Sequence, residues 1–262
     1  MSAFSFHAGT TPLLISIPHA GTDVPADIEK RFTPVGRELT DTDWYVDSLY
    51  AFARDLGASV LKANYSRYVV DLNRSSDSTP LYASSPTSPV CPTSTFGGEA
   101  IYRAGAAPDA SEIAARIERY WRPYHRQLEE ELARIKSERG IALLWDAHSI
   151  PSEVPSLFPG VLPEFNFGTR DDASCPRHVA DALLRLMVTD GKFGAVLNGR
   201  FKGGFITLHY GRPAEKIYAV QLELAQRTYM RESPRGSFDP QHANAAMRYI
   251  GQLLQQYLDS SL

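Results

Sequence analysis

The sequence Ile141-Ala142-Leu143-Leu144-Trp145-Asp146-Ala147-His148-Ser149 joins an apolar run directly to polar side chains. A short, continuous apolar run of this kind predicts a buried strand over 141–145. A second run, Leu13-Leu14-Ile15-Ser16-Ile17, predicts another buried strand and is followed by Pro18 and His19. Strands that are apolar on both faces are typical of parallel sheets covered by helices. The two runs therefore indicate an α/β fold.

Longer amphipathic stretches lie between further apolar runs over the rest of the chain. The predicted helices cover 44–56, 109–140 with a kink at Pro123, 176–189 and 239–258. The remaining predicted strands cover 59–63, 68–72, 195–198, 205–208 and 217–224. Because strands and helices alternate without a linker or a repeat, residues 1–262 are predicted to form a single α/β domain. We expect a mixed, mostly parallel sheet with helices on both faces.

Two long stretches rich in Ser, Thr, Pro or Gly, 73–98 and 149–172, are predicted to be loops. Irregular segments of this length in a compact domain are often functional. We therefore expect that these two loops can close over a site and exclude water.

The composition limits the kind of protein that this chain can be. Of its 262 residues, 43% are hydrophobic and 22% are charged, which is typical of soluble globular proteins. The net charge of −3 offers no excess of positive charge to a polyphosphate, so no nucleic-acid partner is expected. No apolar run approaches the ~20 residues that span a bilayer, so no membrane partner is expected.

The two cysteines and the N-terminus bear on the compartment. Cys91 and Cys175 lack the spacing of a cysteine metal site and suit a reducing environment. The first residues lack the basic and then apolar pattern of a signal peptide. These features predict a cytoplasmic protein, while the sequence leaves its oligomeric state unknown.

Histidines follow both of the apolar runs quoted above. His19 comes after the first run and His148 comes after the second. Because ligands bind at the carboxyl ends of the strands in open α/β sheets, we expect the two imidazoles to lie at one edge. Imidazole is the commonest metal-ligating side chain, but each histidine could instead hold a turn through the backbone. The residues alone leave both roles open.

Three carboxylates, Asp41, Asp43 and Asp47, lie within seven residues at a predicted helix start. One aspartate is favoured there as a cap and by the helix dipole. The others leave a carboxylate that could complete a site of two histidines and one carboxylate, which is an arrangement of catalytic zinc.

The predicted strand 217–224 carries two polar side chains, Gln221 and Glu223, on one face. A carboxylate in an otherwise apolar strand is costly to bury without a partner. Glu223 could form a salt bridge with Arg227, or it could be a general base that takes a proton from water at a metal site.

Four cations lie near predicted strands. Arg67 and Arg74 flank one strand, and Arg200 and Lys202 lie in a glycine-rich turn. Arginine binds carboxylates with two parallel hydrogen bonds, although Arg74 could instead pair with Asp71 and Lys202 could simply be exposed. No helix is predicted directly after the turn, as a phosphate loop would require. The cations therefore favour a small acidic ligand over a nucleotide.

Seven stretches, taken together and in order, resemble the N-formylglutamate amidohydrolases. They span most of the chain, about residues 10–232. The stretches are PHAGTDVP (18–25), DTDW (41–44), SRYVVDLNR (66–74), WRPYH (121–125), DAHSI (146–150), NGRFKGG (198–204) and VQLELAQRTYM (220–230).

The resemblance implies an α/β fold related to the zinc carboxypeptidases, that is, a zinc-exopeptidase-like (phosphorylase/hydrolase-like) fold. It implies hydrolysis of N-formyl-L-glutamate to formate and L-glutamate in histidine degradation. The implied cofactor is one divalent metal ion, Zn2+, and the implied partner is a small acidic N-acyl amino acid as substrate.

The resemblance also implies roles for individual residues. His19 and His148 would be metal ligands, with Asp43 as the third because the family motif ends in Asp-Trp; Asp41 and Asp47 are the alternatives. Glu223 matches the catalytic glutamate of related zinc amidohydrolases. Position 22 is threonine where the carboxypeptidase motif has glutamate, which leaves the third ligand open. The implied substrate-binding residues are Arg67, Asn73, Arg74, Arg103 and Lys202.

Two other functions fit the same residues. The chain could be a zinc amidohydrolase that cleaves another N-acyl amino acid or a cell-wall amide. It could also be a non-catalytic protein that binds a small dicarboxylate through the same arginines.

Overall fold

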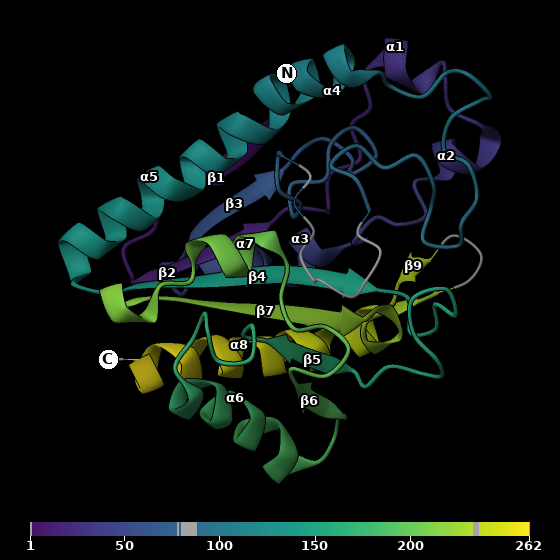
Figure 1. The fold of residues 1–262 in the computed structure, drawn as a ribbon. Coiled ribbons are helices and arrows are strands. Elements are labelled where there is room, and N and C mark those ends of the chain that lie inside the picture. The colour runs from purple at the N-terminus through teal and green to yellow at the C-terminus, as the bar shows by residue number, and fades with distance from the viewer. Residues whose placement is uncertain (1, 78, 80–87, 233–235, 262) are drawn as a thin grey trace.

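A seven-stranded sheet with the order β1-β3-β2-β4-β7-β5-β6 forms the centre of the molecule (Figure 1). The computed structural model describes residues 2–77, 79, 88–232 and 236–261. The strands of the sheet are β1 (Phe4–His7), β2 (Leu13–Ile17), β3 (Ser59–Ala63), β4 (Ala142–Ile150), β5 (Phe165–Gly168), β6 (Ala195–Leu197) and β7 (Ile217–Ala225). Two further short strands, β8 (Met230–Arg231) and β9 (Ser237–Phe238), pair with each other outside it.

The prediction of a mixed, mostly parallel sheet is confirmed. The neighbours β3, β2, β4 and β7 run parallel to one another, and so do β5 and β6. The edge strand β1 is antiparallel to β3, and β5 is antiparallel to β7. Four parallel strands therefore bring their carboxyl ends to one edge of the sheet.

Helices cover both faces of the sheet, as predicted (Figure 1). On one face, side chains of α1, α5 and α7 pack against Leu14, Leu144 and Ala219. On the other face, α3, α6 and α8 pack against Leu13, Trp145 and Leu222. The helices are α1 (Ala26–Glu29), α2 (Pro34–Glu38), α3 (Val46–Leu49), α4 (Ala110–Arg116), α5 (Arg122–Arg139), α6 (Arg177–Asp190), α7 (Phe205–Tyr210) and α8 (Pro240–Ser261), with short 3-10 segments η1 (Ala51–Arg54), η3 (Pro213–Glu215) and η4 (Gln226–Thr228).

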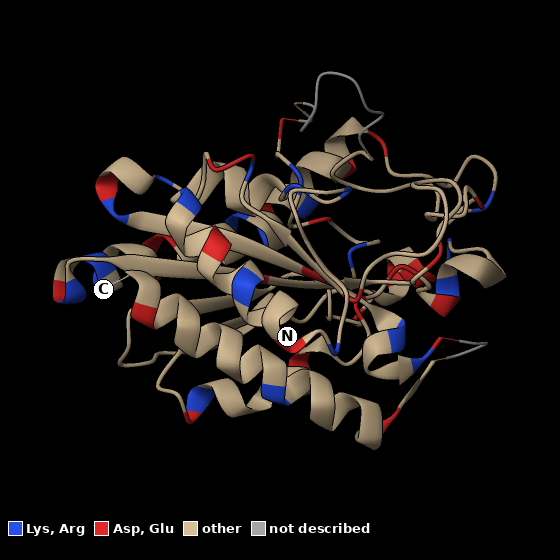
Figure 2. Ribbon diagram, turned by 90° about the horizontal axis from the view of Figure 1, so that it is seen from below, with Lys and Arg blue, Asp and Glu red and all other residues tan. Residues whose placement is uncertain are grey.

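Figure 2 shows charged residues mainly on the helices and loops and few along the strands. None of the described helices is both long enough and apolar enough to cross a membrane. Burial of the sheet therefore depends on the two apolar clusters that the helices complete.

The face of the sheet that carries α5 and α7 changes from apolar to polar along the strands. On β4, Leu144 belongs to the apolar cluster of this face, and Asp146 and His148 follow it at spacings of two residues. On β7, Gln221 and Glu223 follow Ala219 in the same way. Asp146 lies beside Gln221, and His148 beside Glu223, in the parallel register. This alternation concentrates polar groups at the carboxyl ends of adjacent strands.

Two of the predicted elements are wrong between β2 and α4. The predicted strand 68–72 is a buried turn region, in which Val69 N donates to Ser66 O at 2.9 Å. Its apolar residues fill the core as a strand would, so periodicity alone could not distinguish the two. The predicted helix 44–56 forms only as the short segments α3 and η1. Tyr45 before them has a left-handed backbone (φ 61°), and Tyr50 between them leaves the helical region (φ −99°, ψ 9°).

The predicted strand 205–208 is also wrong, since these residues begin helix α7. The backbone N–H of Ile206 at its start donates to Asn73 Oδ1 at 2.8 Å, which supplies a capping group distant in sequence. A helix does therefore follow the glycine-rich turn, against our expectation. Its first N–H groups are already bonded within the protein, because Gly204 N donates to Gln221 Oε1 at 2.7 Å. The N–H groups of Gly204 and Ile206 at this helix start are therefore not free to bind a phosphate.

The two predicted loops differ from the expectation in part. The loop 149–172 contains strand β5, and neither β5 nor β1 was predicted from the sequence. Within the loop 73–98, residues 78 and 80–87 lie outside the described residues. The strand β4 runs to Ile150, so His148 lies within the strand rather than after it.

The long predicted helix after Asp109 forms as α4, a π-helical turn η2 (Ile117–Trp121) and α5. Asp109 caps it, as its side chain accepts a hydrogen bond from Glu112 N at 2.8 Å. The irregular turn comes before Pro123, which lies in the first turn of α5 where a proline is tolerated.

Candidate active site

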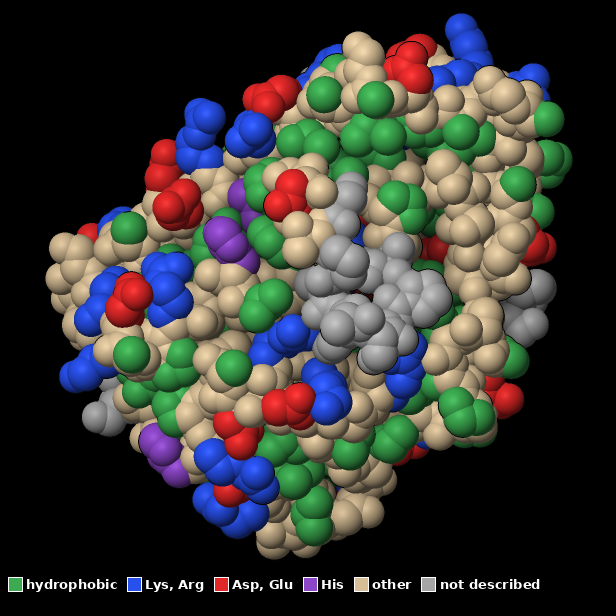
Figure 3. Space-filling view, in the orientation of Figure 1, with side chains coloured by type: hydrophobic (Ala, Val, Ile, Leu, Met, Phe, Trp, Pro, Cys, Tyr) green, Lys and Arg blue, Asp and Glu red, His purple; other side chains and the backbone are tan. Residues whose placement is uncertain are grey.

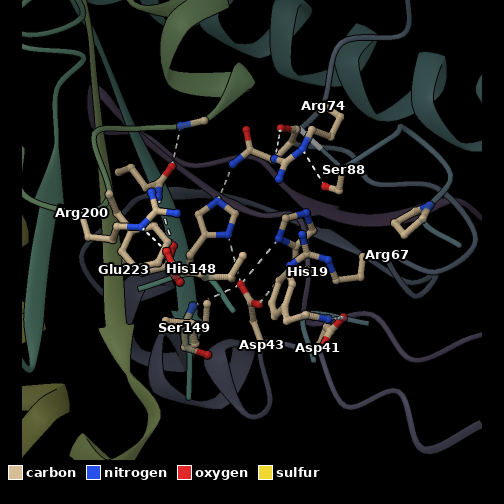
Figure 4. Close-up of a pocket in the computed structure, with 18 of the residues that line it drawn as sticks. His19, Asp41, Asp43, Arg67, Arg74, Ser88, His148, Ser149, Arg200 and Glu223 are labelled. Atoms are coloured by element: carbon tan, nitrogen blue, oxygen red, sulfur yellow. Dashed lines mark hydrogen bonds and ion pairs between the residues drawn. The ribbon is translucent and has the colours of Figure 1, made fainter. Parts of the chain in front are cut away.

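A cavity of about 290 Å³ lies at the carboxyl ends of β2, β4 and β7 (Figure 4). His19 enters it just after β2, His148 from β4 and Glu223 from β7. Both predicted loops also contribute described residues to its wall, among them Phe96 and Leu157. Loops and strand ends that are distant in sequence therefore surround one group of buried polar side chains.

His19, Asp43 and His148 form a buried group that could hold a metal ion. One possible ligand atom from each residue lies within 4.8 Å of the other two. Oδ2 of Asp43 lies 3.1 Å from Nδ1 of His148 and 3.8 Å from Nδ1 of His19. The ring centroids of the two histidines are 4.8 Å apart. The structure thus brings together all three of the implied ligands.

The outer nitrogens of both histidines face carboxylates. Nε2 of His19 lies 2.8 Å from Oδ1 of Asp71, and Nε2 of His148 lies 3.0 Å from Oδ2 of Asp146. The Arg67 guanidinium holds the pKa of Asp71 well below its usual range despite the opposing effect of burial. An ionised carboxylate only accepts hydrogen bonds, so Nε2 of His19 donates and Nδ1 keeps its lone pair.

The inner Nδ1 atoms fit a cation. Nδ1 of His19 is buried and has no hydrogen-bond partner among the described residues. Two imidazole nitrogens and a carboxylate oxygen that converge in this way are donors typical of zinc. Histidines that ligate metals commonly donate their other nitrogen to a carboxylate, as Asp71 and Asp146 allow here. The donor set therefore fits a divalent metal ion.

The two alternative aspartates have other partners. Oδ2 of Asp41 accepts a hydrogen bond from the backbone N–H of Phe96 at 2.9 Å. Asp47 is partly exposed and pairs with Lys62 at 2.9 Å. Neither carboxylate belongs to the metal-binding group found in the described part of the chain. Asp43 is therefore the carboxylate that the geometry favours.

Burial and charge act differently on the two histidines. Burial lowers the pKa of His19, which favours the neutral imidazole that can bind a cation. Burial also opposes protonation of His148, but the carboxylates of Asp146 and Asp43 outweigh it and raise its pKa well above the usual value. Nδ1 of His148 and Oδ2 of Asp43 therefore need a proton or a cation between them.

Glu223 is buried in the cavity wall beside this group. Burial raises its pKa to about 8; the charges of Asp43 and Asp146 act in the same direction, and those of His148 and Arg67 oppose them. Oε2 of Glu223 accepts a hydrogen bond from Gln221 Nε2 at 3.1 Å, which holds the carboxyl group in place. Arg227 pairs with Glu164 at 2.7 Å instead, so the alternative salt bridge to Glu223 does not form. A perturbed carboxyl group in a cavity is a candidate acid or base.

The predicted substrate-binding cations are not all in the same place. Arg67, Arg74 and Lys202 line the cavity, together with Arg200. Arg103 does not appear among the described lining residues, and its guanidinium donates to backbone carbonyls of Lys30 and Phe32. Within the described part of the chain, Arg103 therefore has no contact through which it would meet a ligand in this cavity.

Asn73 lines the cavity, but its amide also bonds within the protein. Its Nδ2 donates to Asp146 Oδ2 at 3.3 Å and lies 2.9 Å from Nε2 of His148. A side chain at Gly204 would collide with it, because a Cβ there would lie 2.3 Å from Asn73 Nδ2. Asn73 thus joins the environment of His148 to the start of α7.

A match to a known protein family shows which family the chain belongs to. The sequence model of the N-formylglutamate amidohydrolase family matches residues 11–230. The chain belongs to the N-formylglutamate amidohydrolase family. The resemblance inferred from the seven motifs is therefore confirmed.

Two curated relatives are similar over nearly the whole chain. The protein named N-formylglutamate deformylase of Pseudomonas aeruginosa is 50% identical over 254 residues, which cover 97% of this chain and 95% of the relative. The protein of the same name from Pseudomonas putida is 49% identical with the same coverage. Family membership thus extends beyond the motifs to the complete fold.

Two solved structures have a similar fold. The crystal structure of N-formylglutamate amidohydrolase from Ralstonia eutropha has a TM-score of 0.83 at 25% identity and covers 100% of this chain and 98% of its own. A gene product of Agrobacterium tumefaciens, 18% identical with a TM-score of 0.73, covers 99% of this chain and 96% of its own, and shares the fold.

The carboxylates that hold the two histidines, Asp71 and Asp146, were not predicted as site residues from the sequence. Asp146 lies two residues before His148 on one strand, so the period of a strand places both on one face. That spacing was visible in the sequence. The pairing of Asp71 with Arg67 at 2.6 Å, rather than with Arg74, depends on the turn that replaces the predicted strand 68–72.

Replacing Asp71 with asparagine is expected to weaken metal affinity by about 10- to 100-fold. The substitution removes the charged acceptor that orients His19 through Nε2. Metal affinity is measured by titration of the metal-free protein with zinc. Asp47→Asn is the matched control, since Asp47 pairs with Lys62 on the surface. An unchanged affinity in Asp71→Asn, or a large loss in Asp47→Asn, would contradict this reading of the site.

Proposed function

We propose that the chain is a zinc-dependent amidohydrolase that converts N-formyl-L-glutamate and water to formate and L-glutamate, as a cytoplasmic step of histidine degradation. Convergence of His19, Asp43 and His148 beside the carboxyl group of Glu223 carries the proposal. The relatives that are about half identical and bear the name N-formylglutamate deformylase support it. We also infer that the single predicted domain is related to the zinc exopeptidases.

His19, Asp43 and His148 would hold the metal ion. When bound there, the ion supplies a Lewis acid that polarises the formyl carbonyl and activates water. Asp71 and Asp146 keep the histidine rings oriented through their outer nitrogens. Three ligands with at least one position left for substrate or water are typical of catalytic zinc sites.

Glu223 would act as the general base and then as the general acid. As a base, its carboxylate removes a proton from the water that attacks the formyl carbon. The C–N bond then breaks, and Glu223 returns the proton to the amine of the departing glutamate. Gln221 holds Oε2 of Glu223, which orients the carboxyl group for both transfers.

Arg67 is placed to stabilise negative charge that develops on the formyl oxygen. Its Nη1 lies 4.0 Å from Oδ1 of the proposed ligand Asp43, and its Nη2 is held by Asp71 at 2.6 Å. The Phe96 ring covers the guanidinium, with its centroid 4.7 Å from the carbon Cζ. A cation fixed in this way can support an oxyanion without first reorganising.

Formate release from N-formyl-L-glutamate, with and without a chelator, tests the proposed function. We expect activity to disappear when the protein is stripped of metal and to return when zinc is added. A panel of N-formyl and N-acetyl amino acids, assayed for formate and acetate, then identifies the acyl group and the amino acid. Activity that survives complete metal removal would reject the metal-dependent mechanism. Zinc that binds without any hydrolysis of the panel would favour a binding protein.

A further inference from the structure

Arg200 lines the cavity from the loop between β6 and α7. In the view of Figure 4, His148 lies between Arg200 and Arg67. Figure 3 shows Lys and Arg side chains gathered near the middle of this face of the molecule. Arg200 and Arg67 thus flank His148 in the view of Figure 4.

Two of the other lining cations already have a carboxylate partner. Arg67 pairs with Asp71 at 2.6 Å in the buried part of the site. Lys202 pairs with Asp171 at 2.9 Å near the surface. A substrate carboxylate that met either group would share that cation with a carboxylate of the protein.

The Arg200 side chain has a backbone hydrogen-bond partner, but no carboxylate of the described chain neutralises its charge. Its Nε donates to the backbone carbonyl of Leu157 at 2.8 Å, and its Cζ lies 5.6 Å from the centroid of the Phe201 ring. No aspartate or glutamate of the described chain forms an ion pair with it. The terminal nitrogens that bind carboxylates as a fork therefore have no protein acceptor in that part of the chain.

The two carboxylates of the substrate differ in their distance from the bond that breaks. The α-carboxylate is attached to the carbon next to the scissile nitrogen, so it must lie close to the proposed metal group. In the side chain of glutamate, three carbon atoms separate the scissile nitrogen from the carbon of the second carboxylate. It therefore extends farther from the metal group, and Arg200 lines the same cavity with an exposed side chain.

We propose that Arg200 binds the side-chain carboxylate of the substrate and makes the enzyme selective for N-formyl dicarboxylic amino acids. This inference rests on the proposed function, since it assigns one end of the same substrate. In this proposal Arg200, rather than Arg103 or Lys202, distinguishes glutamate from a neutral amino acid.

The ratio of kcat/KM for N-formyl-L-glutamate to that for N-formyl-L-glutamine measures this selectivity. Glutamine replaces the side-chain carboxylate by a neutral amide of nearly the same shape. In Arg200→Gln, we expect the ratio to fall by about 10- to 100-fold, through a higher KM for N-formyl-L-glutamate, because a charge-assisted hydrogen bond is lost.

Arg248→Gln is the matched control. Like Arg200, Arg248 on α8 is exposed, and its guanidinium lies over the ring of the following residue, with Cζ 5.7 Å from the Tyr249 ring centroid. Arg248 lines a different groove, between α6 and α8. We expect the ratio to change by less than about 2-fold in this variant, as for an ordinary surface substitution. Lys202→Gln should change the ratio less than Arg200→Gln does, because Asp171 compensates its charge.

Three kinetic results would overturn the assignment of Arg200: an unchanged ratio in Arg200→Gln, an equal loss on both substrates, or a larger fall in Lys202→Gln. Calorimetric binding of L-glutamate and L-glutamine separates the assignment from the proposed function. If the wild-type protein hydrolyses neither substrate, but Arg200→Gln weakens glutamate binding alone, the proposed function fails and the assignment stands. A wild-type protein that binds glutamate no better than glutamine rejects the assignment.

Discussion

Replacing Glu223 with glutamine is expected to lower kcat for N-formyl-L-glutamate by at least ~100-fold while the metal ion stays bound. Glutamine keeps the size of the side chain and can still contact Gln221, but it cannot accept a proton from water. Glu223 is outside the group His19, Asp43 and His148, so its loss removes no proposed ligand. Formate release measures kcat, and elemental analysis of the purified variant measures the metal content.

The control for this variant is Glu215→Gln. Glu215 lies just before the amino end of β7, pairs with Arg212 at 3.0 Å and is far along the strand from Glu223. We expect Glu215→Gln to keep both activity and metal. Full activity in Glu223→Gln would remove this residue as the base, and loss of metal together with activity would show that it is instead a ligand.

A lower kcat accompanied by an unchanged KM would agree with a group that acts mainly in the transition state. A rise in KM alone would indicate that Glu223 binds substrate without moving a proton. The two kinetic constants thus distinguish a catalytic role from a binding role at one position.

The sequence predicted best those features that depend on local periodicity. The run Leu13–Ile17 is apolar throughout, and the structure buries all of it in β2. Its carboxyl end then places His19 beside the end of β4, because parallel neighbours end at one edge. The group of His19 and His148 followed from that single rule about parallel sheets.

The features that were missed depend on contacts distant in sequence. Residues 205–208 resemble a strand in composition, yet they form α7, whose first turn is bonded by Asn73. Residues 68–72 are apolar because they fill the core, although Asp71 among them holds both His19 and Arg67. Tertiary contacts outweighed local preference in both segments.

The charged residues show the same limit. Nothing in the sequence separates Arg103, which binds backbone carbonyls near Phe32, from Arg200, which lines the cavity. Both are single arginines in loops, and their positions follow from how those loops pack on the sheet. Prediction of a ligand class from the cations was possible, whereas their assignment to one cavity needed the fold.

Replacing His148 with alanine is expected to abolish metal binding and hydrolysis together, with activity falling to the detection limit. The substitution removes one of three proposed ligands and leaves Asp43 without the partner that now lies 3.1 Å from its Oδ2. His148 also bonds to Asp146, so the change empties a buried polar site. Elemental analysis and formate release on the same preparation measure the two losses.

His209→Ala is the control for the loss of an imidazole. His209 lies on α7, its ring stacks on Phe205, and it is not one of the described residues that line the cavity. We expect this variant to keep its metal and most of its activity. A thermal unfolding curve shows whether His148→Ala still folds. The dependence of hydrolysis on the metal can also be tested without a substitution, by adding zinc to metal-free wild-type protein and measuring whether activity returns. The contrary result is a His148→Ala variant that folds, retains a full equivalent of zinc and hydrolyses N-formyl-L-glutamate at the normal rate. That result would mean that other residues form the metal centre. Glu223 would then lose the activated water on which its proposed role depends.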